Sequence, residues 1–171
     1  AAGFITGEGN GFYLPENRLQ RGELITMLYR YSGEHVSAEA MAALPFTDVP
    51  KDAYYAEAVA WAYDKGIVSG DAGGVFLPQR FAERQEMCSI FLRYLQASDV
   101  ILQEGSSSAD KYADGQKVAP WAYHAVGIMT DIGLLSGEEN GMFNPTAGST
   151  RAQAAAVLTR LTDFVDKNVT K

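Results

Sequence analysis

Apolar residues recur with helical spacing in three stretches of the chain. In each stretch they stand at positions i, i+3, i+4 and i+7, which is the period of a helix that buries one face. The pattern predicts helices at about 20–32, 83–96 and 150–165. The three stripes are Leu24, Met27, Leu28 and Tyr31; Met87, Ile90, Phe91 and Tyr94; and Ala154, Val157, Leu158 and Leu161.

Two further helices are predicted upstream of the second and third stripes, at 53–65 and 121–132. Each is followed by a glycine, Gly66 or Gly133, which favours a left-handed helix end. A short helix is also expected within 37–44. In the helix at 53–65 the residues predicted to share the buried face are Tyr55, Ala58, Val59 and Ala62.

The starts of the three striped helices differ in their capping residues. Thr150 and Gln153 have the spacing of a capping box, in which two side chains satisfy the free N–H groups of the first turn. Gln20 and Glu83 stand at the position of Thr150 in the other two copies. They are expected to cap less well.

A loop pattern precedes each striped helix, so the chain contains a repeat. The pattern is Gly, a second Gly four residues later, an aromatic residue two further on, then Pro, and an Arg six residues beyond the Pro. Its three copies begin at Gly7, Gly70 and Gly137, and their arginines are Arg21, Arg84 and Arg151. A second arginine follows nine residues later in each copy, at Arg30, Arg93 and Arg160, and is expected to be structural or solvated.

The first copy has no upstream half, because the chain begins at Ala1. We expect that this half lies in a longer parent protein or is supplied by another chain. The predicted organisation is half a repeat at 1–32 and full repeats at 46–97 and 111–165, joined by connectors at 33–45 and 98–110. One helix-loop-helix unit cannot bury its stripe alone. An all-α fold is therefore predicted, with the repeats arranged about a pseudo-threefold axis around a central three-helix bundle.

The ordered motifs resemble the S-layer homology family of bacterial surface proteins. The motifs that match the family are Phe46-Thr-Asp48-Val49, Gly66-Ile-Val-Ser-Gly70, Gly74-Val-Phe76-Leu-Pro78 and Thr150-Arg151-Ala152-Gln153. The resemblance implies that grooves between repeats bind a secondary cell wall polysaccharide, often one that carries an acidic pyruvate ketal. The implied carbohydrate-binding residues are Arg21, Arg84, Arg151, Asp48, Asp114, Tyr54 and Trp121.

Each of these residue types has a second interpretation. A guanidinium at the start of a helix suits a carboxylate ligand, but the arginines could instead form ion pairs within the chain. Tyr54 and Trp121 could stack on sugars or pack against a neighbouring unit. Asp48 and Asp114 could accept sugar hydroxyls, although capping of the following helix is slightly favoured. Trp61 is expected to lie in the core.

Composition and charge exclude several classes of function. The net charge is −7 and basic residues are scattered, so no nucleic-acid partner is predicted. No apolar run reaches the roughly 20 residues of a membrane span, so no membrane insertion is expected. The two histidines have no metal-ligand spacing, and no nucleophile or phosphate-loop motif is present. Neither a metal, a cofactor nor an enzymatic activity is therefore predicted. The single cysteine, Cys88, is expected to be a buried structural thiol.

The predicted function is that of a non-catalytic anchoring module. It would be extracellular, on a bacterial cell wall, and covalently part of a larger surface protein. The alternative is a protein-interaction or oligomerisation module of the same fold that binds no carbohydrate.

Overall fold

The computed structural model describes residues 16–98, 100, 102 and 108–168. The loop of the first repeat copy, which begins at Gly7, lies outside these residues. The chain divides into two compact units. The first unit comprises residues 1–82 with 150–152, and the second comprises 83–149 with 153–171.

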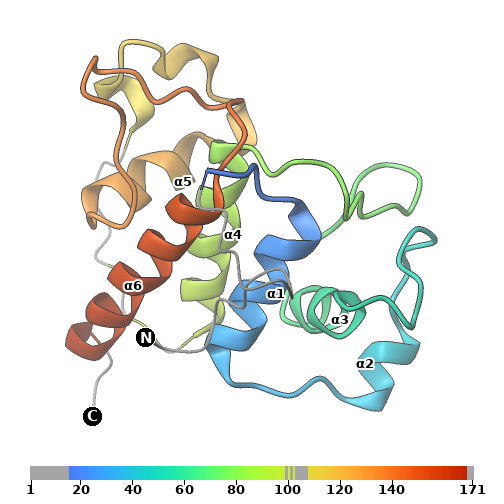
Figure 1. Cartoon of the computed structure of the whole chain (residues 1–171). Helices are drawn as coiled ribbons and strands as arrows, with labels where there is room; N and C mark the ends of the chain where they lie inside the picture. Colours follow the sequence, from blue (N-terminus) through green and yellow to red (C-terminus); the bar gives the residue numbers. More distant parts are fainter. Residues whose placement is uncertain (1–15, 99, 101, 103–107, 169–171) are drawn as a thin grey trace. The chain divides into compact units, whose positions relative to one another are not determined.

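The described residues of the first unit contain α1 (Arg21–Ser32), α2 (Ala38–Ala42) and α3 (Ala56–Asp64). Helices α1 and α3 pack against each other, and α2 contacts α3 (Figure 1). Leu24, Met27 and Leu28 of the α1 stripe are buried, as is every residue of α3 from 58 to 62. Trp61 is 2% exposed, so its predicted place in the core is confirmed.

The second unit contains α4 (Arg84–Ala97) and α5 (Pro120–Asp131), which pack against each other (Figure 1). Two short 3-10 helices, η1 (Ala109–Lys111) and η2 (Gly115–Lys117), contact one another, and η1 also contacts α5. The last helix, α6 (Arg151–Asn168), has its first two residues in the first unit and the rest in the second.

The all-α fold class is confirmed, since the described part of the chain has helices and only isolated β-bridges. The helices predicted from periodicity are all present, with ends shifted by at most a few residues. Gly66 and Gly133 have φ angles of 69° and 75°, as a left-handed helix end requires. In the three stripes only Tyr31 and Tyr94 escape burial. The pseudo-threefold arrangement stays a prediction.

The expectation of weak caps at Gln20 and Glu83 was wrong. Both residues take part in capping boxes, because a glutamate stands three residues later. The Gln20 N–H donates to Glu23 Oε2 at 2.8 Å, and the Glu83 N–H donates to Glu86 Oε2 at 3.0 Å. In each box the side chain of the cap residue also accepts the N–H of that glutamate, so Gln20 and Glu83 perform the role expected of a Ser or Thr.

Two glycines of the repeat are required because an aromatic ring covers them. A β-carbon on Gly70 would lie 2.3 Å from Cε1 of Phe46, and one on Gly137 would lie 2.4 Å from Cε1 of Tyr112. Tyr112, two residues before Asp114, stands in the third copy where Phe46 stands in the second. Its hydroxyl donates to Thr130 Oγ1 at 2.9 Å and accepts the Gly137 N–H at 3.0 Å, so the extra polar group is satisfied.

Gly70→Ala should destabilise the protein by about 3 kcal/mol, because the methyl group collides with Phe46 and φ is +71°. Gly73→Ala is the matched control. Gly73 also has a positive φ, +92°, but nothing lies within 4 Å of its added β-carbon, so only about 1 kcal/mol should be lost. Chemical denaturation of both variants measures the difference. Equal losses would show that the ring does not constrain Gly70.

Candidate functional site

Asp48 and Asp114 bind the backbone of the loop in their own repeat. Asp48 accepts the N–H groups of Phe76 and Leu77 at 2.8 and 2.7 Å. Asp114 accepts those of Phe143 and Asn144 at 2.7 and 2.8 Å. In each loop the second of these residues has a positive φ, 58° for Leu77 and 54° for Asn144. Both carboxylates therefore fix a strained turn.

The favoured capping role of these aspartates was wrong. Helix α3 begins after Tyr55 and α5 after Ala119, and neither has a side-chain cap. Asp114 immediately precedes η2 but makes no side-chain cap there either. The physical reason is that each carboxylate already accepts two loop N–H groups, which a cap would have to displace.

The surroundings of Asp114 also act on its acidity. The residue is 2% exposed, and burial raises its pKa. The hydrogen bonds from the Phe143 and Asn144 N–H groups, with its own N–H and the charge of Lys117, outweigh burial and leave the pKa of Asp114 below its usual value. The folded protein therefore favours the charged carboxylate.

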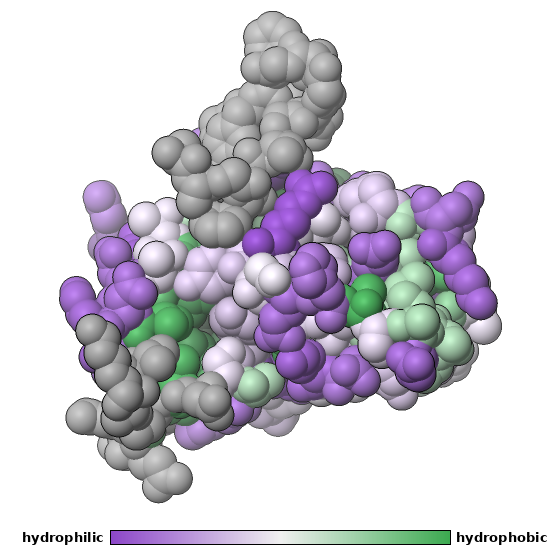
Figure 2. Space-filling model, turned by 90° about the horizontal axis from the view of Figure 1, so that it is seen from below, coloured by the Kyte–Doolittle hydropathy of each residue, from purple (hydrophilic) through white to green (hydrophobic). Residues whose placement is uncertain are grey.

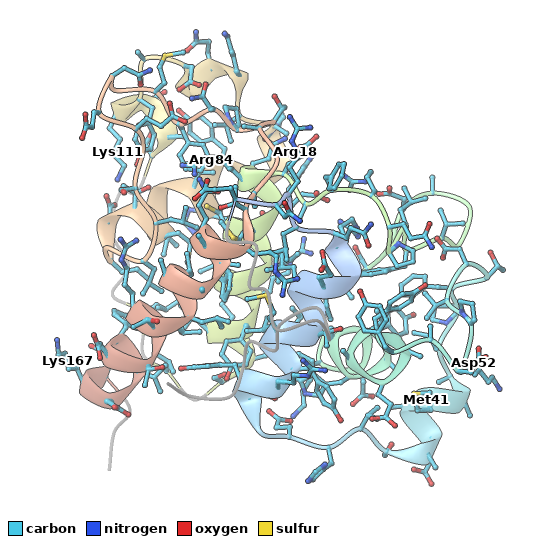
Figure 3. The ribbon with its side chains drawn as sticks, in the orientation of Figure 1. Arg18, Met41, Asp52, Arg84, Lys111 and Lys167 are labelled. Carbon is cyan, nitrogen blue, oxygen red and sulfur yellow. The ribbon has the colours of Figure 1, made fainter. Side chains whose placement is uncertain are left out.

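Arg21 and Arg84 bind the same two loops from the carbonyl side. Arg21 Nε donates to the Phe76 carbonyl at 3.0 Å, and its guanidinium carbon lies 4.7 Å from the centre of the Phe76 ring. Arg84 repeats this with Phe143, at 2.8 and 4.9 Å, and donates through Nη2 to the Ser136 carbonyl at 2.9 Å. Arg84 is the first residue of α4 (Figure 3).

Four of the seven predicted site residues thus form two equivalent clamps around a loop aromatic. In each clamp an aspartate holds the N–H and an arginine holds the carbonyl of one phenylalanine, Phe76 or Phe143, whose ring is fully buried. Arg21 and Arg84 are themselves 7% and 5% exposed. This geometry favours the structural interpretation of both arginines.

Arg151 has different surroundings. Its Nη1 forms an ion pair with Glu23 Oε1 at 2.6 Å, and its backbone N–H donates to the Asn17 carbonyl at 3.1 Å. Beside this pair the first unit has a hollow of about 260 Å³. The residues that line the hollow are Asn17, Arg18, Gln20, Glu23 and Arg151. Every one of them is polar, so the hollow suits a polar or charged ligand.

Two charged residues that line this hollow, Glu23 and Arg151, also act on the hydroxyl of Tyr54. Burial raises the pKa of its hydroxyl, and the charge of Glu23 raises it further, while Arg151 and Arg30 act in the opposite direction. The residue is nevertheless 63% exposed, and Trp121 on α5 is 55% exposed. These are the two most exposed large apolar side chains of the described residues. Their exposure favours sugar stacking over packing.

Several residues of this region were missed by the sequence analysis. Asn17 and Arg18 lie between the loop motif and the helix motif, where the repeat copies share no residue type, and Gln20 was considered only as a helix cap. Phe81 occupies in the second copy the position of Arg18 in the first, three residues after the proline. It is 46% exposed, and its backbone forms an isolated bridge with Gln20. A comparison of the copies for the positions at which they differ would have drawn attention to Arg18 and Phe81.

The remaining described residues offer little other chemistry. Cys88 is fully buried, and burial raises the pKa of its thiol to about 12, so its predicted structural role is supported. None of the described helices is long and apolar enough to span a membrane. No group of three or more potential metal-ligating His, Cys, Asp or Glu side chains occurs among these residues. The face drawn in Figure 2 carries both hydrophilic and apolar side chains.

These features define a class of protein: a helical repeat module whose loops are held by Asp and Arg side chains and which has a polar hollow lined by two arginines. The family model of the S-layer homology domain matches residues 45–88 and 111–155, just over half of the chain. The matches cover most of the two repeats that have both halves. The protein therefore belongs to the S-layer homology domain family.

Relatives extend the similarity over most of the chain. The Surface-layer 125 kDa protein of Lysinibacillus sphaericus is 32% identical over 96% of this chain and 13% of its own length. The amylopullulanase of Thermoanaerobacterium thermosulfurigenes is 31% identical over 85% of this chain and 8% of its own. The cellulosome-anchoring protein of Acetivibrio thermocellus is 23% identical over 93% and 35%. The chain thus spans only a minor part of each relative. The predicted family and its association with bacterial cell-surface proteins are confirmed.

Proposed function

We propose that the chain is a non-catalytic anchoring module that binds an acidic secondary cell wall polysaccharide, for example one with pyruvate ketals. The observation that carries the proposal is the hollow beside Arg151, whose wall contains two arginines and one glutamate. The charges of Glu23 and Arg151 also act on the hydroxyl of the exposed Tyr54. In a protein of net charge −7, such a local excess of positive charge favours an anion.

The relatives support an anchoring role rather than a catalytic one. The three relatives have names that indicate different roles: a surface-layer protein, an amylopullulanase and a cellulosome-anchoring protein. Each of them matches this chain over only a limited part of the relative's own length. A segment common to such different proteins is best explained as a shared means of attachment. We accordingly place the chain outside the cell, covalently within a larger surface protein.

The proposed binding residues are now unequal in their availability. Tyr54 and Trp121 are exposed to solvent and keep the proposed carbohydrate role. Arg151 keeps it only as a residue in the wall of the hollow, because its side chain is 8% exposed and paired with Glu23. The backbone around the buried rings of Phe76 and Phe143 is held by Arg21, Arg84, Asp48 and Asp114, so a ligand would have to compete with bonds that the fold itself uses. For these four, we propose that they shape the module and do not touch the polymer.

Sedimentation with isolated cell walls tests the proposed function. The protein should pellet with walls of Lysinibacillus sphaericus and Acetivibrio thermocellus, and should stay in solution once the secondary polymer has been extracted. Tyr54→Ala should weaken wall binding about tenfold through loss of a stacking surface, and should leave the thermal melt unchanged because the side chain is exposed. Tyr54→Phe keeps the ring and should bind almost normally.

Failure of the unaltered protein to bind any native wall would contradict carbohydrate anchoring. A concentration-dependent self-association or capture of a second surface protein would then favour the alternative, a protein-interaction module. Binding to native walls that survives removal of the secondary polymer would show that another wall component is the ligand.

A further inference from the structure

The charges of the hollow are not equally available to a ligand. Glu23 has both carboxylate oxygens engaged, Oε1 by Arg151 Nη1 at 2.6 Å and Oε2 by the Gln20 N–H at 2.8 Å. Arg151 is correspondingly neutralised, and its side chain is only 8% exposed. The remaining positive charge of the hollow is that of Arg18.

Arg18 is exposed and close to an exposed aromatic ring. It lies in the segment that precedes α1 (Figure 3), and its guanidinium carbon is 5.8 Å from the centre of the Phe81 ring. Within the described residues its guanidinium makes no hydrogen bond and no ion pair. Arg18 is therefore able to take a new anionic partner without breaking an internal bond.

Phe81 places an apolar surface next to this charge. Its backbone pairs with that of Gln20, and its ring lies 5.8 Å from the guanidinium carbon of Arg18; both partners line the hollow, although Phe81 itself does not. The residue remains 46% exposed with Arg18 beside it. An exposed aromatic ring thus lies beside an arginine that has no ion-pair partner among the described residues. An acidic sugar would use both groups. The guanidinium offers a fork of N–H donors for a carboxylate, and the aromatic ring offers a flat face for the C–H groups of the sugar.

We propose that Arg18 and Phe81 form a subsite for one acidic sugar residue of the polymer, with the carboxylate on the Arg18 guanidinium and the sugar ring against Phe81. This proposal rests on the proposed function, and it assigns specificity for the acidic group to Arg18 rather than to Arg151. In it, Glu23 is a positioning residue that holds Arg151 in the wall of the hollow. Neither Arg18 nor Phe81 belongs to the repeated motif.

Wall binding of charge-matched variants tests the subsite. Arg18→Gln and Phe81→Ala are compared with Arg93→Gln, which removes the same charge from an exposed arginine that does not line the hollow. Arg18→Gln and Phe81→Ala should each weaken binding to native walls about tenfold, whereas Arg93→Gln should bind like the unaltered protein. Thermal melts should be unchanged in Arg18→Gln, since its side chain is exposed.

Chemical modification of the walls identifies the anion. Amidation of wall carboxyl groups with a carbodiimide and an amine should lower binding of the unaltered protein to the level of Arg18→Gln, and should not lower that variant further. An undiminished binding after amidation would overturn the carboxylate assignment in favour of a phosphate-bearing polymer, since phosphate groups stay charged.

The outcomes separate the two proposals. If the unaltered protein binds native walls but Arg18→Gln behaves like Arg93→Gln, the subsite is wrong and wall anchoring stands. If Phe81→Ala alone has no effect, the stacking half of the subsite is overturned. If the unaltered protein binds no wall of either bacterium, both proposals fail together.

Discussion

Asp114→Ala should destabilise the second unit by about 4 kcal/mol. The substitution removes the acceptor for two N–H groups, those of Phe143 and Asn144, and an unsatisfied buried donor costs about 1–3 kcal/mol. The same two bonds hold Asn144 at a φ of 54°, which is unfavourable for a residue with a side chain, so the substitution also leaves this turn without support. Both losses fall on the loop that holds the buried Phe143 ring.

Chemical or thermal denaturation at neutral pH measures this loss. Asp163→Ala, on the exposed side of α6, is the control for loss of one carboxylate and should change stability by less than about 0.5 kcal/mol. If both variants melt together, the Asp114 hydrogen bonds contribute nothing to stability, and a direct role in ligand binding would again need to be considered.

The pKa of Asp114 predicts a dependence on pH with a definite sign. Because this pKa is lower in the folded protein than in the unfolded chain, the charged carboxylate stabilises the fold above the ordinary aspartate pKa of about 3.9. This contribution is lost as the pH falls through the folded pKa. The stability difference between the unaltered protein and Asp114→Asn should therefore shrink on acidification below about pH 4, as melts between pH 7 and pH 2.5 would show.

The sequence was sufficient to predict the helices because their signals are local and repeated. The stripe of α4 and the glycine after α3 each depend on residues within a few positions, so periodicity and turn chemistry place them well. The clamp of Arg84 on Phe143 joins residues 59 positions apart. A repeated Arg and a repeated aromatic are both visible in the sequence, but nothing in their spacing says that one donates to the carbonyl of the other.

The hollow was less predictable for a related reason. Arg151 lies 128 positions from its ion-pair partner Glu23. Glu23 also accepts the Gln20 N–H at the start of α1, a role that the sequence analysis did not predict either. Arg18 and Phe81 occupy a position that varies among the copies, whereas the search for a repeat selects what the copies share. The residues proposed to give one site its own specificity are thus the ones that a repeat pattern hides.

Arg84→Ala should destabilise the protein by about 3 kcal/mol, even though its position in the repeat also suits a ligand-binding arginine. The buried guanidinium donates to the carbonyls of Phe143 and Ser136 and lies against the Phe143 ring. Truncation leaves both carbonyls without this donor and opens a space beside the ring. Arg84→Lys should recover less than half of the loss, because an ammonium cannot reproduce the planar fork.

Arg93→Ala is the matched control for this experiment, since it removes an exposed arginine from the same helix and should cost less than about 0.5 kcal/mol. The variant with both Arg84→Ala and Asp114→Ala adds a further test. Because both side chains hold the backbone of Phe143, the first substitution releases the loop that the second would release, and the combined loss should be smaller than the sum of the single losses. An Arg84→Ala protein that melts like the unaltered one but no longer binds walls would reverse this assignment and make Arg84 a contact for the polymer.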